Sequence, residues 1–270
     1  MTPTMDHASE ISRGQRFEFG ANWAQFLKVL NDERIAQAEK SLKDMLGVPD
    51  LAGKRFLDAG SGSGLFSLAA RRLGATVHSF DYDPQSVACT QELRRRHFPD
   101  DRGWTVEQAS VLDREYLSRL GKFDVVYSWG VLHHTGAMWC ALENVTSLVA
   151  ERGQLCIAIY NDQGWISGYW RTVKRLYSRS AILRWPLLLL HGSYLFGLRW
   201  LVRALTGRLK LERGMSLWHD TVDWIGGYPF EVARPETILR FCRERGFHLH
   251  QLKTCGGRHG CNEFVLVRKD

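Results

Sequence analysis

The sequence lacks the features that mark several classes of protein. Its first residues have no basic flank and no apolar run, and the apolar run 185–198 is too short to cross a bilayer, which takes about 20 residues. The six cysteines in 270 residues are scattered and do not form a disulfide framework. Prolines number only seven, and we find no repeat or low-complexity tract. We therefore expect a reduced, cytoplasmic, globular protein with one larger domain.

Acidic residues are nearly absent from one segment of the chain. Residues 165–213 contain ten lysines and arginines but a single acid, Glu212, which gives this segment a net charge of +9. The whole chain carries +7, so the remainder is slightly acidic. Any inference from charge about an anionic partner is therefore an inference about this segment.

Short apolar runs alternate with helical patterns after residue 50. Five such runs predict strands, at residues 55–59, 75–80, 104–109, 123–128 and 154–160. Strands that alternate with helices predict an α/β fold with a parallel sheet covered on both faces. A glycine-rich loop separates two further runs, 247–254 and 263–268, which predict a hairpin whose last strand enters the sheet antiparallel. A helix should lie before this hairpin, between Pro235 and Gly246.

The first 50 residues precede this alternating region. Apolar residues recur at helical spacing from Trp23 to Leu46, before Gly47 and Pro49. We expect an N-terminal helical cover over residues 1–50, with residues 1 to about 20 loosely ordered.

The strongest local signal is the segment LDAGSGSG, residues 57–64, between the first strand and a helix. Its alternating glycines allow a tight turn and let the backbone approach a ligand closely. A dinucleotide-binding turn would have glycine at position 65, where this chain has Leu65. Asp58 stands two residues before the first glycine, and its carboxylate favours a ligand with positive charge.

Asp81 ends the second predicted strand, about twenty residues after the glycine turn. An acidic residue in this position can accept hydrogen bonds from ribose hydroxyls. The glycine turn and Asp81 together resemble the class I S-adenosylmethionine-dependent methyltransferase family. The resemblance covers most of residues 17–160 and the closing hairpin.

This resemblance implies a fold, a cofactor and a set of binding residues. The fold is a doubly wound, Rossmann-like, seven-stranded and mostly parallel sheet. The catalytic domain spans 51–164 and 214–270, and residues 165–213 form an inserted helical lid. The cofactor is S-adenosylmethionine, released as S-adenosylhomocysteine, and the implied binding residues are Asp58, Gly60, Ser61, Gly62, Asp81, Tyr82, Ser110, Val111, Leu112, Ser128 and Trp129.

The segment SWGVLHHTG, residues 128–136, resembles the family's loop that faces the cofactor and the acceptor. Methyl transfer from a sulfonium is an in-line displacement, so the enzyme mainly aligns the reacting atoms and excludes water. A base is needed only where the acceptor must lose a proton. His133 and His134 are the candidates for this base, because histidine titrates near neutral pH.

The sequence leaves the acceptor open, and we expect a small-molecule or lipid-like one. Nucleic acid is disfavoured, because the Asn-Pro-Pro-Tyr type of signature for base methylation is missing after the fourth strand. The insertion 165–213 is rich in tryptophan and favours an apolar or amphipathic acceptor. It is either a lid alone or a lid that also contacts an anionic membrane surface.

Three other interpretations are weighed against this enzyme. The first is a non-catalytic, membrane-associated protein that binds S-adenosylmethionine without turnover. The second is a nicotinamide oxidoreductase, which would need the missing glycine. The third is a metal site at the C-terminal hairpin, where histidines and cysteines gather, but their spacing fits no familiar zinc pattern, so we predict no metal.

Overall fold

The structure is a computed structural model that describes residues 7–192, 197, 224–257 and 260–270. Residues 193–213 of the expected lid therefore lie outside the described residues, apart from Gly197.

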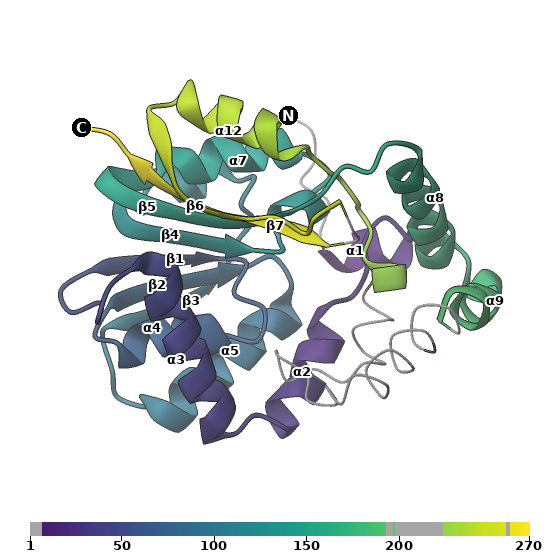
Figure 1. Cartoon of the computed structure of the whole chain (residues 1–270). Helices are drawn as coiled ribbons and strands as arrows, with labels where there is room; N and C mark the ends of the chain where they lie inside the picture. Colours follow the sequence, from purple (N-terminus) through teal and green to yellow (C-terminus); the bar gives the residue numbers. More distant parts are fainter. Residues whose placement is uncertain (1–6, 193–196, 198–223, 258–259) are drawn as a thin grey trace.

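Seven strands form one sheet, in the order β3-β2-β1-β4-β5-β7-β6 (Figure 1). The first five pair in parallel, and β7 lies antiparallel between β5 and β6. The predicted seven-stranded, mostly parallel α/β sheet with an antiparallel closing hairpin is confirmed. The strands are β1 (Arg55–Ala59), β2 (Thr76–Asp81), β3 (Trp104–Gln108), β4 (Phe123–Trp129), β5 (Val149–Tyr160), β6 (Phe247–Lys253) and β7 (Cys261–Arg268).

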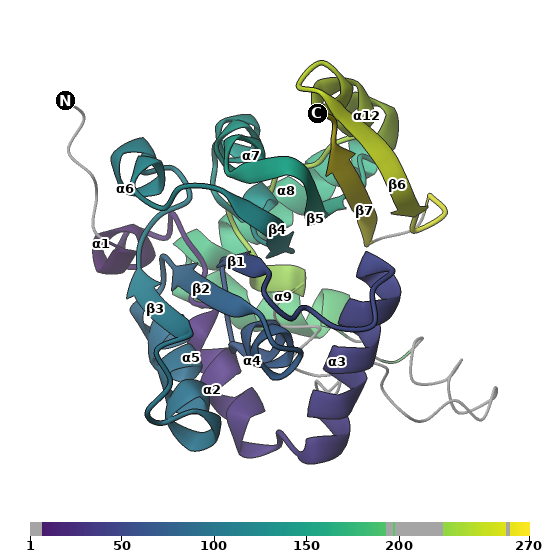
Figure 2. The ribbon, with the colours of Figure 1, turned by 90° about the vertical axis from the view of Figure 1, so that its left-hand side faces the viewer.

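Helices cover both faces of the sheet (Figures 1 and 2). Neighbouring residues of a strand point to opposite faces, and both sides are buried: Phe56 packs in one apolar cluster and Leu57 in the other. One face carries α3 (Asp32–Leu46), α4 (Leu65–Arg72) and α5 (Pro84–His97), and the other carries α6 (Arg114–Ser118), α7 (Met138–Ser147) and α12 (Pro235–Arg243).

Local sequence sets where these helices begin and end. The side chain of Asn31 accepts a hydrogen bond from the Arg34 backbone N–H at 3.0 Å and starts α3, which ends at Gly47 with a φ of 69°. Asp83 caps α5 in the same way, with Pro84 in the first turn. The Asp83 cap places the first turn of α5 just after the carboxyl end of β2, where a ligand site is expected in this class of fold.

The N-terminal segment contradicts one expectation. Residues 7 to 20 are not loosely ordered, because α1 (His7–Ser12) and the turn after it pack against the rest of the chain. Arg16 forms an ion pair with Glu10 at 2.6 Å, and the Phe17 N–H donates to the Tyr228 carbonyl at 2.8 Å. These contacts are long-range or charge-based, so the segment has no apolar periodicity that could reveal them. The next helix, α2 (Gly20–Lys28), continues this cover.

Two helices after β5 lie beyond the carboxyl ends of the parallel strands (Figure 1). They are α8 (Trp165–Arg179) and α9 (Ala181–Gly192). Apolar side chains from both helices, including Trp170 and Leu188, pack in a third cluster with Ile225 and Phe230. Among the helices that the structure describes, none is both long and apolar enough to span a bilayer.

Candidate functional site

The glycine turn lies between the end of β1 and the start of α4. Gly60, Gly62 and Gly64 have φ values of 89°, 54° and 79°, a backbone region that side-chain-bearing residues rarely adopt. A Cβ at position 62 would come within 3.1 Å of the Trp23 indole, and one at position 60 would collide with Val131. The turn therefore requires glycine at these positions, both for its backbone conformation and because Val131 and Trp23 pack directly on it.

Asp81 lies at the end of β2, directly beside this turn. Its carboxylate accepts hydrogen bonds from the backbone N–H groups of Gly62 and Asp83, both at 2.9 Å. Burial raises the pKa of Asp81 to about 6, although these two hydrogen bonds oppose the shift. The structure therefore brings together the predicted residues Gly60, Ser61, Gly62 and Asp81 at the carboxyl edge of the sheet.

Asp58 is buried one layer deeper, with 2% of its surface exposed. It accepts a hydrogen bond from the Ser67 hydroxyl at 2.5 Å, and that hydroxyl also contacts Ser79 at 2.7 Å. Burial raises the pKa of Asp58 to about 7, and the nearby Asp81 raises it further. This carboxylate is held by α4 under the turn, where a cation above it would favour the ionised form.

Asp58 should make stability depend on pH. Its folded-state pKa of about 7 lies above the unfolded value of 3.8, so the native state holds the extra proton and stability falls as pH rises toward 7. Asp58→Asn removes this dependence. The free energy of unfolding of the variant minus that of the wild type is expected to be roughly 2–3 kcal/mol larger at pH 8 than at pH 5. Urea unfolding of both proteins at the two pH values measures this difference, and equal differences at both values would refute the assignment.

The segment after β3 lies at the same edge of the sheet. Val111 is mostly a core residue, 6% exposed, and its carbonyl accepts from the Asn144 amide at 2.9 Å. Ser110 caps the turn by accepting from the Leu112 N–H at 3.1 Å. Tyr82 follows Asp81 and is covered by the Arg16 guanidinium, 4.9 Å from its ring centre. Ser110, Val111 and Leu112 stay predicted adenine-pocket residues, and Tyr82 stays a predicted cofactor-binding residue.

Two predicted binding residues on β4 have side chains that face elsewhere. Ser128 is fully buried and donates to the Ala59 carbonyl at 2.7 Å, which ties β4 to β1. The Trp129 indole stacks on Tyr127, with ring centres 5.5 Å apart, and lines a groove of about 710 Å³ between α3 and the β6–β7 hairpin. Val131, which the sequence did not single out, is the residue from this loop that packs against the glycine turn.

The two candidate bases stand side by side after β4, in the short 3₁₀ helix η1 (Leu132–His134). Nδ1 of His134 contacts the Pro229 carbonyl at 2.7 Å, so this nitrogen carries the proton. His133 is fully buried, and its ring nitrogens form no hydrogen bond of ordinary geometry with the described residues, although the Ala158 backbone is near enough to raise its pKa. His134 is thus held by the Pro229 carbonyl, whereas His133 has only this weaker contact with Ala158.

Both histidines are neutral at physiological pH. Burial drives the pKa of His133 well below its ordinary value, and the nearby His134 and Lys174 lower it further. Burial likewise lowers the pKa of His134 to about 3, and the hydrogen bond to Pro229 opposes the shift. A neutral imidazole keeps its lone pair available as a proton acceptor.

The N-terminal cover contributes residues that the sequence did not identify. Arg16 donates to the His134 carbonyl at 2.9 Å while its guanidinium lies over Tyr82. The Phe19 ring packs on His134 at 4.9 Å, and Trp23 packs on Gly62. The helical spacing of Trp23 was a signal for a buried position, but no pattern around Arg16 indicated its contact with the site.

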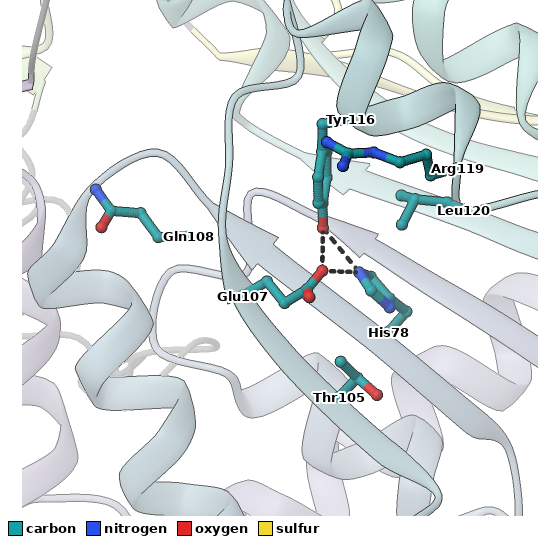
Figure 3. Close-up of a pocket in the computed structure, with 7 residues that line it drawn as sticks. All are labelled: His78, Thr105, Glu107, Gln108, Tyr116, Arg119 and Leu120. Carbon is teal, nitrogen blue, oxygen red and sulfur yellow. Dashed lines mark hydrogen bonds and ion pairs between the residues drawn. The ribbon is translucent and has the colours of Figure 1, made fainter.

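A second groove lies away from these residues, on the β2–β3 edge beside α6 (Figure 3). It encloses about 670 Å³. The Tyr116 hydroxyl donates to Glu107 and contacts His78 Nε2, both at 2.8 Å. Burial and Glu107 raise the pKa of Tyr116, and burial lowers the pKa of His78. The groove contains none of the predicted site residues, and its polar groups already bind one another.

Comparison with known proteins agrees with this geometry. A methyltransferase domain family matches residues 50–188, just over half of the chain. The tRNA U34 carboxymethyltransferase of Methylococcus capsulatus is 32% identical over 111 residues, which cover 41% of this chain and 33% of that protein. The ubiquinone biosynthesis O-methyltransferase of Rhodopseudomonas palustris is 28% identical over 130 residues, covering 47% and 48% of the two chains. The matched region thus spans half or less of these curated relatives.

Among solved structures, the magnesium protoporphyrin IX methyltransferase of Synechocystis PCC 6803 with bound S-adenosylmethionine has a TM-score of 0.53. The superposition covers 87% of this chain and 79% of that one at 13% identity, so it shows a shared fold. The family's cofactor is S-adenosylmethionine. From the family match, the sheet order and the glycine turn, the chain belongs to the class I S-adenosylmethionine-dependent methyltransferase family.

Proposed function

We propose that the protein transfers a methyl group from S-adenosylmethionine to a small-molecule or lipid-like acceptor by in-line displacement. One observation carries this proposal. The glycine turn with Asp81 beside it, 2.9 Å from the Gly62 N–H, shares an edge of the sheet with a buried histidine, His133, whose ring nitrogens form no hydrogen bond of ordinary geometry among the described residues. A cofactor cradle and a proton acceptor are the two parts that methylation of a protonated acceptor requires.

The chain's own groups would hold the cofactor as follows. The backbone of the glycine turn receives the methionine part, and the Asp81 carboxylate accepts from the ribose hydroxyls. Tyr82 and the 110–112 loop flank the adenine. The buried carboxylate of Asp58 lies below the turn and favours positive charge above it. When bound, S-adenosylmethionine supplies an electrophilic methyl group.

His133 is the better candidate for the base. His134 already uses Nδ1 for the Pro229 carbonyl, and its own carbonyl accepts from Arg16. The ring nitrogens of His133 form no hydrogen bond of ordinary geometry with the described residues. The centre of the His133 ring lies 4.0 Å from that of Tyr160, at the end of β5. We assign His133 the role of receiving the acceptor's proton and His134 that of shaping the site.

Methyl-labelled S-adenosylmethionine, supplied with a cell extract split into aqueous metabolites, lipids, nucleic acid and protein, tests the proposed function. Label in the metabolite or lipid fraction is expected. Label in the nucleic-acid or protein fraction would refute the acceptor class. Bound cofactor with no label in any fraction would favour the non-catalytic, cofactor-binding alternative.

We also infer that the insertion contacts an anionic membrane surface. Four apolar side chains of α9 are 67–85% exposed: Ile182, Trp185, Leu189 and Leu190. Residues 165–192 contain no acid, and the exposed arginines 171, 175, 179 and 184 accompany this apolar surface. Exposed apolar groups with purely basic neighbours suit the interface of an anionic bilayer. A second copy of the chain would bring like charges together and fits this surface less well.

The protein is expected to sediment with vesicles that contain phosphatidylglycerol, but not with phosphatidylcholine alone, and less at high salt. The double variant Trp185→Glu/Leu189→Glu should abolish sedimentation. Leu249→Glu, on the exposed edge strand β6, adds one negative charge elsewhere and should have no effect, whereas Trp185→Glu alone, which adds the same single charge, should weaken sedimentation. If the wild-type protein does not bind the anionic vesicles, or binds them equally well at high salt, the membrane contact is refuted and the insertion is a lid alone.

A further inference from the structure

A fully buried lysine lies next to the candidate base. Lys174, on α8, is 0% exposed. Its ammonium donates to the Trp224 carbonyl and lies 4.6 Å from the Trp224 ring centre, 4.8 Å from that of Phe230 and 5.9 Å from that of Tyr160. Burying an ammonium is costly unless hydrogen bonds and aromatic faces solvate it, so this placement needs a reason.

Lys174 and His133 pack against the same aromatic side chain. Both contact the Tyr160 ring, whose centre lies 4.0 Å from the His133 ring centre and 5.9 Å from the ammonium. The two groups also interact electrostatically, because Lys174 lowers the pKa of both His133 and His134. A cation, a neutral imidazole and three aromatic rings therefore share one region at α8.

We propose that Lys174 and His133 select an acceptor in which an acidic hydroxyl is carried on an aromatic ring, and that methylation takes place on this oxygen. The proposal rests on the proposed function. An oxygen can accept from the ammonium with one lone pair and attack the methyl carbon with another, whereas an amine nitrogen has a single lone pair for both. Lys174 already donates to one carbonyl oxygen, that of Trp224, and an ammonium has three N–H groups, so it can donate to an acceptor oxygen as well.

The chemistry balances with the groups present and the family's cofactor. The hydroxyl proton moves to His133, the new O–CH₃ bond forms as the S–CH₃ bond breaks, and the bond electrons leave with S-adenosylhomocysteine. The proton on His133 is then released to solvent. Lys174 stabilises the developing oxyanion, which compensates for the weak basicity of a buried imidazole. The aromatic rings contact the faces of a planar acceptor.

The probe is 4-nitrophenol, whose phenolate absorbs near 400 nm and whose neutral form does not. It is titrated at pH 6 into protein saturated with S-adenosylhomocysteine. We expect a saturable phenolate band and an apparent pKa of the bound probe at least one unit below that of the free probe. Lys174→Met is expected to lose the band and to weaken binding at least tenfold. Arg175→Met, exposed on the same helix, should retain both.

Two outcomes would overturn the proposal: a bound probe whose pKa is not lowered in the wild type, or a phenolate band that persists in Lys174→Met. The pKa shift is read on the unmodified protein, so it does not depend on how the variant folds. S-adenosylmethionine affinity, followed by tryptophan fluorescence in the same preparations, separates the two claims. Cofactor binding without phenolate binding refutes only this inference, and absence of cofactor binding refutes the proposed function.

Discussion

Replacing His133 with asparagine is expected to lower the turnover of the labelled acceptor fraction by roughly 10²–10⁴-fold, the usual contribution of a positioned general base. The affinity for S-adenosylmethionine should stay within about twofold, because the proposed role of His133 is toward the acceptor and not toward the cofactor. The measurement is initial rate at saturating cofactor. A loss in cofactor affinity as large as the loss in turnover would show that His133 has a structural role.

Two further histidines make this test specific. His134→Asn should reduce stability more than turnover, because it removes the hydrogen bond to Pro229. His248→Asn, on the exposed strand β6, should leave both unchanged. The pH profile adds a signature. Because the pKa of His133 is lowered, its imidazole stays unprotonated below pH 6.5. Turnover at saturating cofactor should therefore not decrease as the pH is lowered through 6.5, the ordinary pKa of histidine.

The second large effect concerns Asp81. Asp81→Ala is expected to weaken S-adenosylmethionine binding at least tenfold, because ribose hydroxyls left unpaired in a closed site cost roughly 1–3 kcal/mol. Isothermal titration measures the affinity. Because burial raises the pKa of Asp81 to about 6, wild-type affinity should also rise as pH increases through 6, when the carboxylate ionises and becomes a better acceptor.

Glu107→Ala provides the matched comparison for Asp81. Glu107 lies on β3, the strand next to β2, and its carboxylate binds Tyr116 in the groove of Figure 3. It should leave cofactor affinity unchanged. If both variants weakened binding equally, the effect would be one of general charge or fold rather than of ribose recognition.

The fold could be predicted because its signals are local and repeated. Buried strands such as β1 and β4 are short apolar runs, and helices such as α3 and α5 begin or end at a residue with a clear backbone role, Gly47 and Asp83. The antiparallel β7 followed from the glycine-rich loop before it. Such features depend on neighbours in sequence, so a single chain displays them.

The site could be predicted only in part. The glycine turn and Asp81 are recognisable because strand ends and turn geometry place them together. The roles of Arg16 and Lys174 depend on partners more than 40 residues away. The basic composition of residues 165–213 does not distinguish Lys174 from its neighbours, and nothing around Arg16 indicates its contact. Trp129 stands in the predicted motif, but its ring stacks on Tyr127.

Within residues 7–28, one segment contacts both halves of the proposed site. Arg16 covers Tyr82 in the proposed cofactor half and donates to the His134 carbonyl in the proposed acceptor half, while Gly14 packs against the backbone of Ser178 at the end of α8. A ligand that displaces or tightens this segment changes its contacts with both sides at once. Occupancy of one half therefore alters the free energy of binding at the other, and thermodynamic linkage makes that effect reciprocal.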